Sequence, residues 1–403
     1  MTEAMAVELT VYPDDCDAFG HLNQASFLTL FERARWDALA QGPGADAFTR
    51  QGVWPAVRRT TIEYHQQVFP GERLRFTLEL IHHGQTSFAV RQVARKTKSG
   101  AVAADAEFLF VCIGRDGRPV PVPADVSRSF GVRPSRRTGA TQQFTVRGIS
   151  LTADVGGDGP ALLFVHGFPL DRTMWRPLTA ALTGWRRIAP DLRGMGQSEG
   201  PDGGYQLTAY ADDLAALLDA LHVERAVVCG LSMGGYVAFE LLRRHPGRIS
   251  ALILMSTRAT PDDADGRAKR DTMIARVRRD GPAFLADEMT PKLLAPMSLQ
   301  TMPDVVQQVR AMAAAGSPHG IAGALAAMRD RPDSTALLPT ITVPTLVLAG
   351  RDDQLIPVAA ARAMADAIPD AQHAIIPSAG HLPPLEQPVN TGRVVREFLE
   401  ALP

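Results

Sequence analysis

Ser232 lies at the centre of a G-x-S-x-G motif, residues 230–234. The apolar residues 226–229 before it predict a strand, and an amphipathic helix is expected to begin near Tyr236. A serine on a sharp strand-to-helix turn exposes its hydroxyl, and glycine fits the crowded backbone of such a turn. The pattern therefore predicts a nucleophilic serine at Ser232, and a plain glycine-rich turn is the alternative.

Two loops near the end of the chain carry groups that could activate this serine. A serine hydroxyl needs a base, and the base needs an orienting carboxylate. A predicted strand over residues 345–348 leads to Asp352 and Asp353, and another over residues 373–376 leads to His381. We expect His381 to be the base and one of the two aspartates to be the carboxylate. The order serine, aspartate, histidine along the chain is that of α/β-hydrolases.

A further motif, His-Gly-Phe-Pro at residues 166–169, follows the apolar residues 161–165. A loop at this place can direct backbone N–H groups at the negative charge that develops on a substrate oxygen. We expect the N–H groups of Phe168 and Met233 to form this oxyanion hole.

The region 144–403 resembles the α/β-hydrolase superfamily, and within it the carboxylesterases and enol-lactonases. The matching motifs, in the family's order, are residues 166–169, 191–198, 230–235, 350–357 and 380–381. The resemblance implies that Asp353 is the triad acid and that Asp352 caps a turn. It also implies hydrolysis of an ester or lactone without a metal or redox cofactor. A carbon–carbon bond hydrolase and a cofactor-free perhydrolase share this triad and remain alternatives.

The elements around these motifs predict an α/β domain with a helical insertion. Over residues 144–403, short apolar stretches alternate with amphipathic ones, which is typical of a mostly parallel, doubly wound sheet. The alternation breaks over about residues 256–338, which are helical in pattern and rich in Ala and Met. We expect a cap over the substrate pocket there, with flexible methionines suited to an apolar acyl group. The alternative is that these methionines fill helix cores.

The N-terminal region carries a second set of candidate residues. Asp17, His21 and Asn23 lie at the start of a predicted helix over residues 23–39. A carboxylate just before a helix usually caps it. Four strand-like stretches follow, separated by turn-forming residues, so we expect one helix beside an antiparallel sheet, an α+β domain.

The first part of the chain resembles the hot-dog fold acyl-CoA thioesterases of the 4-hydroxybenzoyl-CoA thioesterase type. The matching residues are 15–23, Phe27, 31–35 and 119–123. The resemblance implies that Asp17 is the catalytic carboxylate, as nucleophile or as base for water, with His21 and Asn23 beside the substrate. Because this fold places its active site between protomers, it also implies a homodimer or higher oligomer. The alternative is an acyl-CoA-binding or dimerisation module attached to an esterase.

Length and composition complete these expectations. From the 403 residues we expect a hot-dog domain over residues 1–130, a linker over residues 131–143 and an α/β-hydrolase domain over residues 144–403. The formal net charge of −1 argues against nucleic acid or an anionic membrane as partner. Three scattered cysteines make neither a disulfide framework nor a zinc site. No signal peptide or membrane span is apparent, so a cytoplasmic location is expected. The expected protein is a bifunctional hydrolase acting on acyl-CoA and on a small ester or lactone.

Overall fold

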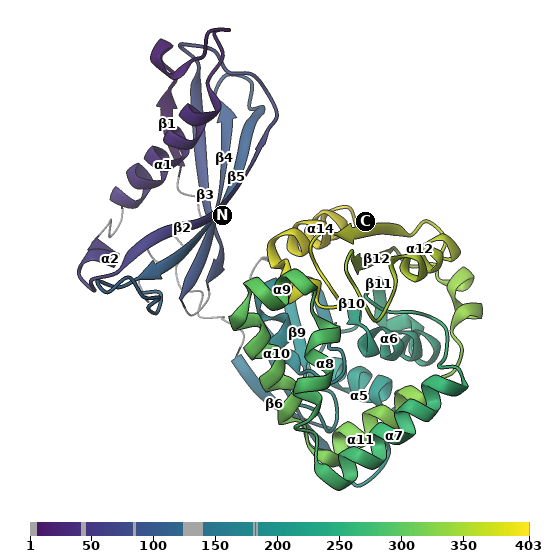
Figure 1. Cartoon of the computed structure of the whole chain (residues 1–403). Helices are drawn as coiled ribbons and strands as arrows, with labels where there is room; N and C mark the ends of the chain where they lie inside the picture. The colour runs from purple at the N-terminus through teal and green to yellow at the C-terminus, as the bar shows by residue number, and fades with distance from the viewer. Residues whose placement is uncertain are drawn as a thin grey trace. The chain divides into compact units, whose positions relative to one another are not determined.

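The computed structural model describes residues 6–41, 46–83, 86–123, 140–179, 182 and 184–402. The chain divides into two compact units, Met1–Arg136 and Arg137–Pro403 (Figure 1). Most of the expected linker, residues 131–139, lies outside the described residues. Residues 140–143 are not linker, because they begin strand β6 (Ala140–Val146), which pairs antiparallel with β7 (Ile149–Gly156). The polar side chains that suggested a linker are tolerated because β6 is an edge strand.

An antiparallel sheet of five strands forms most of the first unit. Its strands are β1 (Ala6–Thr10), β2 (Trp54–Tyr64), β3 (Arg73–His83), β4 (Ser87–Lys96) and β5 (Val102–Ile113), and its helices are η1 (Pro13–Asp15), α1 (Gln24–Ala40) and α2 (Asp46–Thr49). The strand order is β1-β3-β4-β5-β2, and α1 lies along the sheet (Figure 1). Phe31 of α1 is fully buried, and its ring lies 5.3 Å from that of Phe76 in β3. The expected α+β arrangement is confirmed.

A buried arginine joins α1 to the sheet. Arg35 donates from Nη1 to Oε1 of Gln92 in β4 at 2.7 Å, and Nε2 of Gln92 donates to the carbonyl oxygen of Phe31 at 2.9 Å. The guanidinium carbon lies 4.5 Å from the ring centroid of Phe108. Burial lowers the pKa of Arg35 to about 10, so the group remains charged at neutral pH. These contacts fix the helix, and with it the loop that precedes the helix.

An eight-stranded sheet runs through the second unit. Besides β6 and β7 it contains β8 (Ala161–Val165), β9 (Arg186–Pro190), β10 (Ala226–Leu231), β11 (Ile249–Met255), β12 (Thr345–Gly350) and β13 (Gln372–Ile376). The order is β13-β12-β11-β10-β8-β9-β7-β6, parallel from β13 to β9 and antiparallel beyond. In β8, Leu163 and Val165 enter one apolar cluster while Leu162 and Phe164 enter another. Both faces of the sheet are therefore covered, as expected for a doubly wound fold.

The connections around this sheet locate its ligand-binding edge. They include η2 (Arg172–Trp175), α4 (Arg176–Thr179), α5 (Leu207–Ala220), α6 (Met233–Arg244), η3 (Pro246–Arg248), α12 (Val358–Ala367), α13 (Pro383–Glu386) and α14 (Pro388–Glu400). From β8 the chain passes to β9 on one side and then returns to β10 on the other. The carboxyl ends of β8 and β10 thus flank a topological switch point, where open α/β sheets bind ligands.

The helical insertion expected over residues 256–338 is confirmed. Between β11 and β12 lie α7 (Ala264–Asp280), α8 (Leu285–Leu293), α9 (Pro296–Thr301), α10 (Pro303–Ala315), α11 (Pro318–Arg329) and η4 (Thr335–Thr340), most of them green in Figure 1. Helix α7 packs against α11, and α8 packs against α10. Met312 and Met328 are buried in apolar clusters, whereas Met297 is 60% exposed. At least two of the methionines therefore fill helix cores.

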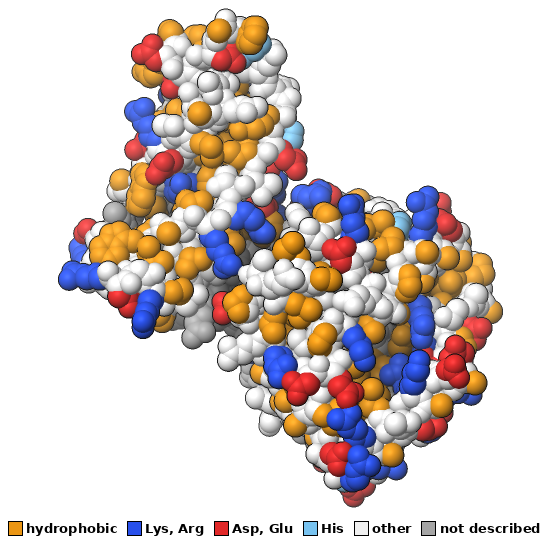
Figure 2. All heavy atoms as spheres, viewed as in Figure 1, with side chains coloured by type: hydrophobic (Ala, Val, Ile, Leu, Met, Phe, Trp, Pro, Cys, Tyr) orange, Lys and Arg blue, Asp and Glu red, His pale blue; other side chains and the backbone are white. Residues whose placement is uncertain are grey.

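The surface carries charges of both signs. Figure 2 shows basic and acidic side chains interspersed with apolar ones on the visible face of each unit. Across the described residues, no helix combines the length and the apolar character needed to cross a membrane.

Candidate active site

Ser232 forms the turn between β10 and α6, with a φ of 54° and a ψ of −112°. The helix begins at Met233, earlier than the expected start near Tyr236, so the serine directly precedes the helix. A positive φ is strained for any residue with a side chain and persists only where the surroundings hold it. Here the N–H of Ser232 donates to the carbonyl oxygen of Met255 at 2.9 Å, and Oγ1 of Thr257 donates to the carbonyl oxygen of Ser232 at 2.8 Å.

The glycines of the motif are required by close packing of the backbone. A Cβ on Gly230 would lie 2.4 Å from the carbonyl oxygen of Gly234. A Cβ on Gly234 would lie 2.0 Å from the carbonyl oxygen of Val165, at the end of β8. Both distances are well inside van der Waals contact. A larger residue at Gly234 would push the serine turn away from β8, and one at Gly230 would push the start of α6 away from β10.

The loops after β12 and β13 bring an aspartate and a histidine together. Nδ1 of His381 lies 3.0 Å from Oδ1 and 2.9 Å from Oδ2 of Asp353, and both side chains are buried. Oδ1 of Asp353 also accepts the N–H groups of Leu355 and Ile356, at 2.8 and 3.0 Å. Asp352 is exposed. With Nδ1–H donating to Asp353, the other ring nitrogen, Nε2, is the one left to act as a base.

The loop 166–169, which is expected to form the oxyanion hole, lies directly against the serine. A Cβ on Gly167 would lie 3.4 Å from Cβ of Ser232 and 3.3 Å from the carbonyl oxygen of Leu231. The next residue along is Phe168, and Met233 is the first residue of α6. The two expected donor residues therefore adjoin the serine turn, one from each side, and the N-terminus of α6 favours negative charge there.

His166 holds this loop rather than taking part in chemistry. It is fully buried, its Nδ1 lies 3.0 Å from the carbonyl oxygen of Gly167, and its Nε2 accepts the N–H of Leu192 at 3.0 Å. Neutral imidazole with the proton on Nδ1 satisfies both contacts. Burial lowers the pKa of His166, which keeps the ring neutral. The residue before Leu192, Asp191, accepts the N–H of Arg172 at 2.7 Å and forms an ion pair with its guanidinium.

The expected site residues of the first unit lie together in the loop before α1. Oδ1 of Asp17 accepts the N–H groups of Phe19 and His21, at 2.9 and 3.1 Å. Asn23, not Asp17, caps the helix, because its Oδ1 accepts the N–H of Ala25 at 2.8 Å. The ring of His21 packs edge-on against Phe69 at a centroid distance of 5.3 Å. Asp17 is exposed, so its carboxylate orders the loop and is also accessible to a substrate.

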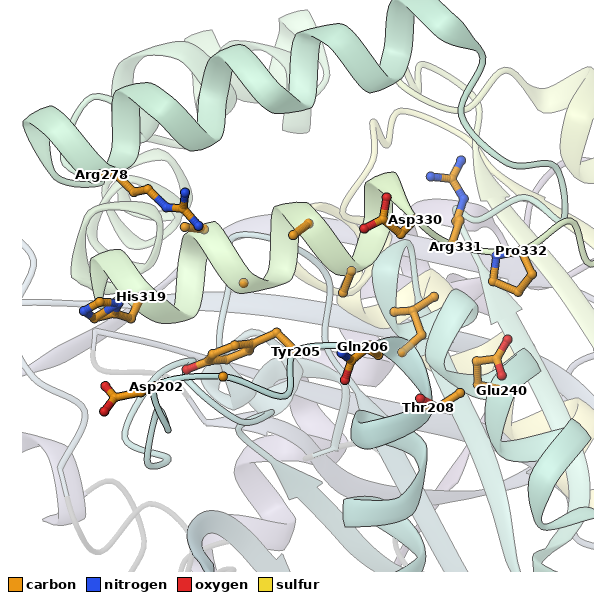
Figure 3. A pocket seen from close by; sticks show the side chains of 16 residues that line it. Asp202, Tyr205, Gln206, Thr208, Glu240, Arg278, His319, Asp330, Arg331 and Pro332 are labelled. Carbon is orange, nitrogen blue, oxygen red and sulfur yellow. The ribbon is translucent and has the colours of Figure 1, made fainter.

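The described residues contain two other features that a ligand could occupy. Glu63, His65 and Asp105 place ligand atoms within 4.8 Å of one another. Glu63 and His65 are exposed and Asp105 is half-buried, and His65 already forms a hydrogen bond with Asp105 at 2.8 Å. A cavity of about 460 Å³ lies between the loop 202–206, the start of α5, and the helices α7 and α11 (Figure 3). Its lining includes Tyr205 but none of the triad residues. Neither feature includes Ser232, His381 or Asp17.

The sequence did not point to Thr257 or Glu386. Thr257 follows the end of β11, at the same sheet edge as the aspartates that were noticed, so its position was the available signal. Glu386 is buried, and its carboxylate accepts the N–H of Gly380, the residue before His381, at 2.8 Å. A lone glutamate after residues 383–385, which are apolar, was the only hint.

The burial of His166 predicts how the stability of the fold changes as the pH falls. Because its folded pKa is lowered, the unfolded chain binds a proton first as the pH falls below about 6.5. Stability is therefore present above that pH and is lost as the pH falls toward the folded pKa, by up to about 1.4 kcal/mol per pH unit. Hydrogen exchange of β8 and β10 in urea, measured between about pH 5.5 and about pH 7.5, should show this slope.

The variant His166→Gln should flatten that slope, since it removes the titrating group. His319→Gln removes an exposed histidine and is the matched control, for which the slope should equal that of the wild type. A wild-type slope of zero across this window would contradict the burial of a neutral His166.

Comparisons with known proteins show the families to which the two units are similar. Residues 160–388 match the family described as alpha/beta hydrolase fold, and residues 11–130 match the thioesterase-like superfamily. The AB hydrolase superfamily protein YisY of Bacillus subtilis is 31% identical over 263 residues, which cover 62% of this chain and 95% of that protein. The 3-oxoadipate enol-lactonase 2 of Acinetobacter baylyi is 29% identical over 232 residues, 57% of this chain and 85% of its own.

Solved structures give the same result. A thermophilic esterase from Thermogutta terrifontis shares 43% identity with a TM-score of 0.63, over 65% of this chain and 99% of its own. The enol-lactonase from Burkholderia xenovorans LB400 shares 29% identity with a TM-score of 0.61. The match covers 64% of this chain and 100% of the enol-lactonase chain. The chain belongs to the alpha/beta hydrolase fold family and carries a thioesterase-like domain ahead of its hydrolase domain.

Proposed function

We propose that this hydrolase is bifunctional, cleaving a carboxylic ester or lactone in its second unit and an acyl-CoA thioester in its first. One observation supports the ester or lactone reaction. The Asp353–His381 pair is buried, at the sheet edge where Ser232 lies in a strained turn. Relatives named as an esterase and as enol-lactonases support the substrate class. An uncharged ester suits a site whose histidine and aspartate are both buried.

The proposed ester reaction uses each of these groups once. Oγ of Ser232 attacks the carbonyl carbon while Nε2 of His381 takes its proton, and Asp353 stabilises the resulting imidazolium. The N–H groups of Phe168 and Met233 bind the oxyanion. His381 then returns the proton to the leaving alkoxide, and a water molecule, activated by the same base, hydrolyses the acyl-enzyme. For a lactone, the alcohol remains part of the acyl group throughout, and hydrolysis of the acyl-enzyme releases a single hydroxy acid.

The variant Ser232→Ala should abolish ester hydrolysis, with kcat falling by several orders of magnitude because no other group supplies the nucleophile. Turnover of a p-nitrophenyl ester panel measures this. Release of CoA from acyl-CoA, followed with a thiol reagent, should stay at the wild-type rate. Ser250→Ala, a partly buried serine within β11, is the control. Normal esterase turnover in Ser232→Ala would show that the serine assignment is wrong.

The proposed thioesterase reaction rests on Asp17. Its carboxylate attacks the thioester carbonyl or removes a proton from the attacking water, and the CoA thiolate departs. Asn23 caps α1, whose N-terminus would polarise the carbonyl, and His21, in the same loop, would lie beside the substrate. The match of residues 11–130 to the thioesterase-like superfamily supports this assignment.

The variant Asp17→Asn should lower CoA release by roughly 100-fold or more, since an amide is neither a nucleophile nor a base at neutral pH. Because the amide oxygen can still accept the N–H groups of Phe19 and His21, the melting temperature should hold. The assay is made with Ser232 also replaced by Ala. Asp14→Asn, an exposed neighbour, is the control. Unchanged CoA release in Asp17→Asn would leave an acyl-CoA-binding or dimerisation module as the better account.

We further propose that the first unit forms a homodimer in the hot-dog arrangement, through strand β2. This strand has 11 residues, lies at the sheet edge and pairs with β5 on its other side. Trp54, Val57 and Tyr64 are 44, 51 and 43% exposed. A long exposed edge strand is a template for pairing with another chain. Antiparallel pairing of two β2 strands centred on Thr61 would set Arg59 opposite Glu63 of the partner subunit.

A charge swap tests this register. Arg59→Glu should raise the dimer Kd by roughly tenfold, because like charges would then face each other twice across the symmetric pair. The double variant Arg59→Glu with Glu63→Arg should restore the wild-type Kd in sedimentation equilibrium. A wild-type protein that sediments as a monomer would refute the dimer, and failure of the double variant to restore the Kd would refute the register.

A further inference from the structure

The loop that carries His381 is held by its own backbone amides. The N–H groups of Gly380 and Leu382, one on each side of His381, both donate to Oε1 of Glu386, at 2.8 and 3.2 Å. The N–H of His381 itself donates to the carbonyl oxygen of Leu293, the last residue of α8, at 3.1 Å. Three consecutive amides around the base are therefore fixed by one glutamate and one helix end.

The other oxygen of Glu386 reaches the helical insertion. Oε2 accepts the N–H of Ala295, between α8 and α9, at 2.7 Å, and the hydroxyl of Ser298 donates to the same carboxylate. The two segments also touch directly, since a Cβ on Gly380 would lie 2.5 Å from the nitrogen of Ala295. Glu386 thus joins the loop of the catalytic base to the first turn of α9.

The chemistry of these contacts favours the ionised form of Glu386. All four partners named above donate a hydrogen to it, and an ionised carboxylate only accepts. The side chain is 1% exposed, and burial raises the pKa of Glu386 while its donors oppose that rise. Because the four partners are uncharged, the negative charge is held by their dipoles, which ties its position to the loop on both sides of His381.

We propose that Glu386 is a positioning residue for serine hydrolysis, which clamps His381 in line with Ser232 and couples that alignment to the helical insertion. This inference rests on the serine mechanism proposed above. A displaced general base slows proton transfer much more than it weakens substrate binding. The role therefore predicts a loss in kcat, whereas a purely structural glutamate would affect the melting temperature alone.

The variant Glu386→Gln tests the role in the full-length protein. It replaces one acceptor oxygen of the side chain with an NH₂ group, and this NH₂ group would face an N–H donor. We expect kcat for a p-nitrophenyl ester to fall by roughly 10–100-fold, with KM within about twofold of wild type. Glu400→Gln makes the same chemical change at an exposed position of α14 and should alter neither constant.

A second measurement isolates the base from the acyl pocket. Diethyl p-nitrophenyl phosphate reacts with Ser232 by forming an Oγ–P bond and breaking the P–O bond to p-nitrophenolate, which leaves, while the serine proton passes to His381. The rate of this phosphorylation should fall in Glu386→Gln by the same factor as kcat. Ser298→Ala removes only the hydroxyl donor on the insertion side, so both rates should fall by a smaller factor. If Glu386→Gln does not fold, Ser298→Ala tests the role in its place.

The outcomes separate this inference from the function on which it rests. Wild-type phosphorylation rates in both variants, even with a lower melting temperature, would overturn the positioning role. If the wild-type protein itself gains no diethyl phosphate mass at Ser232, the serine mechanism has failed instead.

Discussion

The arrangement of the second unit depends on one close backbone contact, where β8 and β10 meet at their carboxyl ends. A Cβ on Gly234 would lie 2.0 Å from the carbonyl oxygen of Val165, and one on Gly167 would lie 3.4 Å from Cβ of Ser232. The serine turn and the oxyanion loop are thus held at van der Waals distance because glycines allow it. This contact also requires β8 and β10 to be neighbours, which the strand order provides. The strain of a positive φ at Ser232 is retained because its surroundings leave the turn no room to relax.

The rest of the site follows from that position and from the parallel sheet. Four neighbouring strands, β10, β11, β12 and β13, each end just before one contributing residue: Ser232, Thr257, Asp353 and His381 respectively. Since parallel strands end at one edge, the topology gathers groups that are far apart in the chain. The histidine comes from the outermost strand of the four, so its loop must be held inward. The backbone bonds to Glu386 and to the end of α8 do this.

Local patterns were sufficient for the parts of the fold and site that depend on neighbouring residues. The serine motif, the strand before it and the helical insertion follow from spacing and periodicity within short windows. The start of α6 at Met233 was missed because the apolar pattern begins only after the glycines. Residues 140–143, the start of β6, were mistaken for linker because an edge strand can be polar. Glu386 could not be recognised, since the role proposed for it depends on a contact with Ala295, 91 residues earlier in the chain.

The two units place their candidate carboxylates in opposite environments, and this bears on how each could work. Asp353 is buried and bonded to a histidine, so solvent is already excluded around the base that it orients. Asp17 is exposed in a turn, with Phe19 beside it 84% exposed. A carboxylate in open water is a weak nucleophile and a weak base, and enclosure strengthens its interactions with a bound thioester. One copy of the first unit leaves Asp17 uncovered, so the proposed dimer would be a condition of the thioesterase reaction, whereas the serine site is assembled within a single chain.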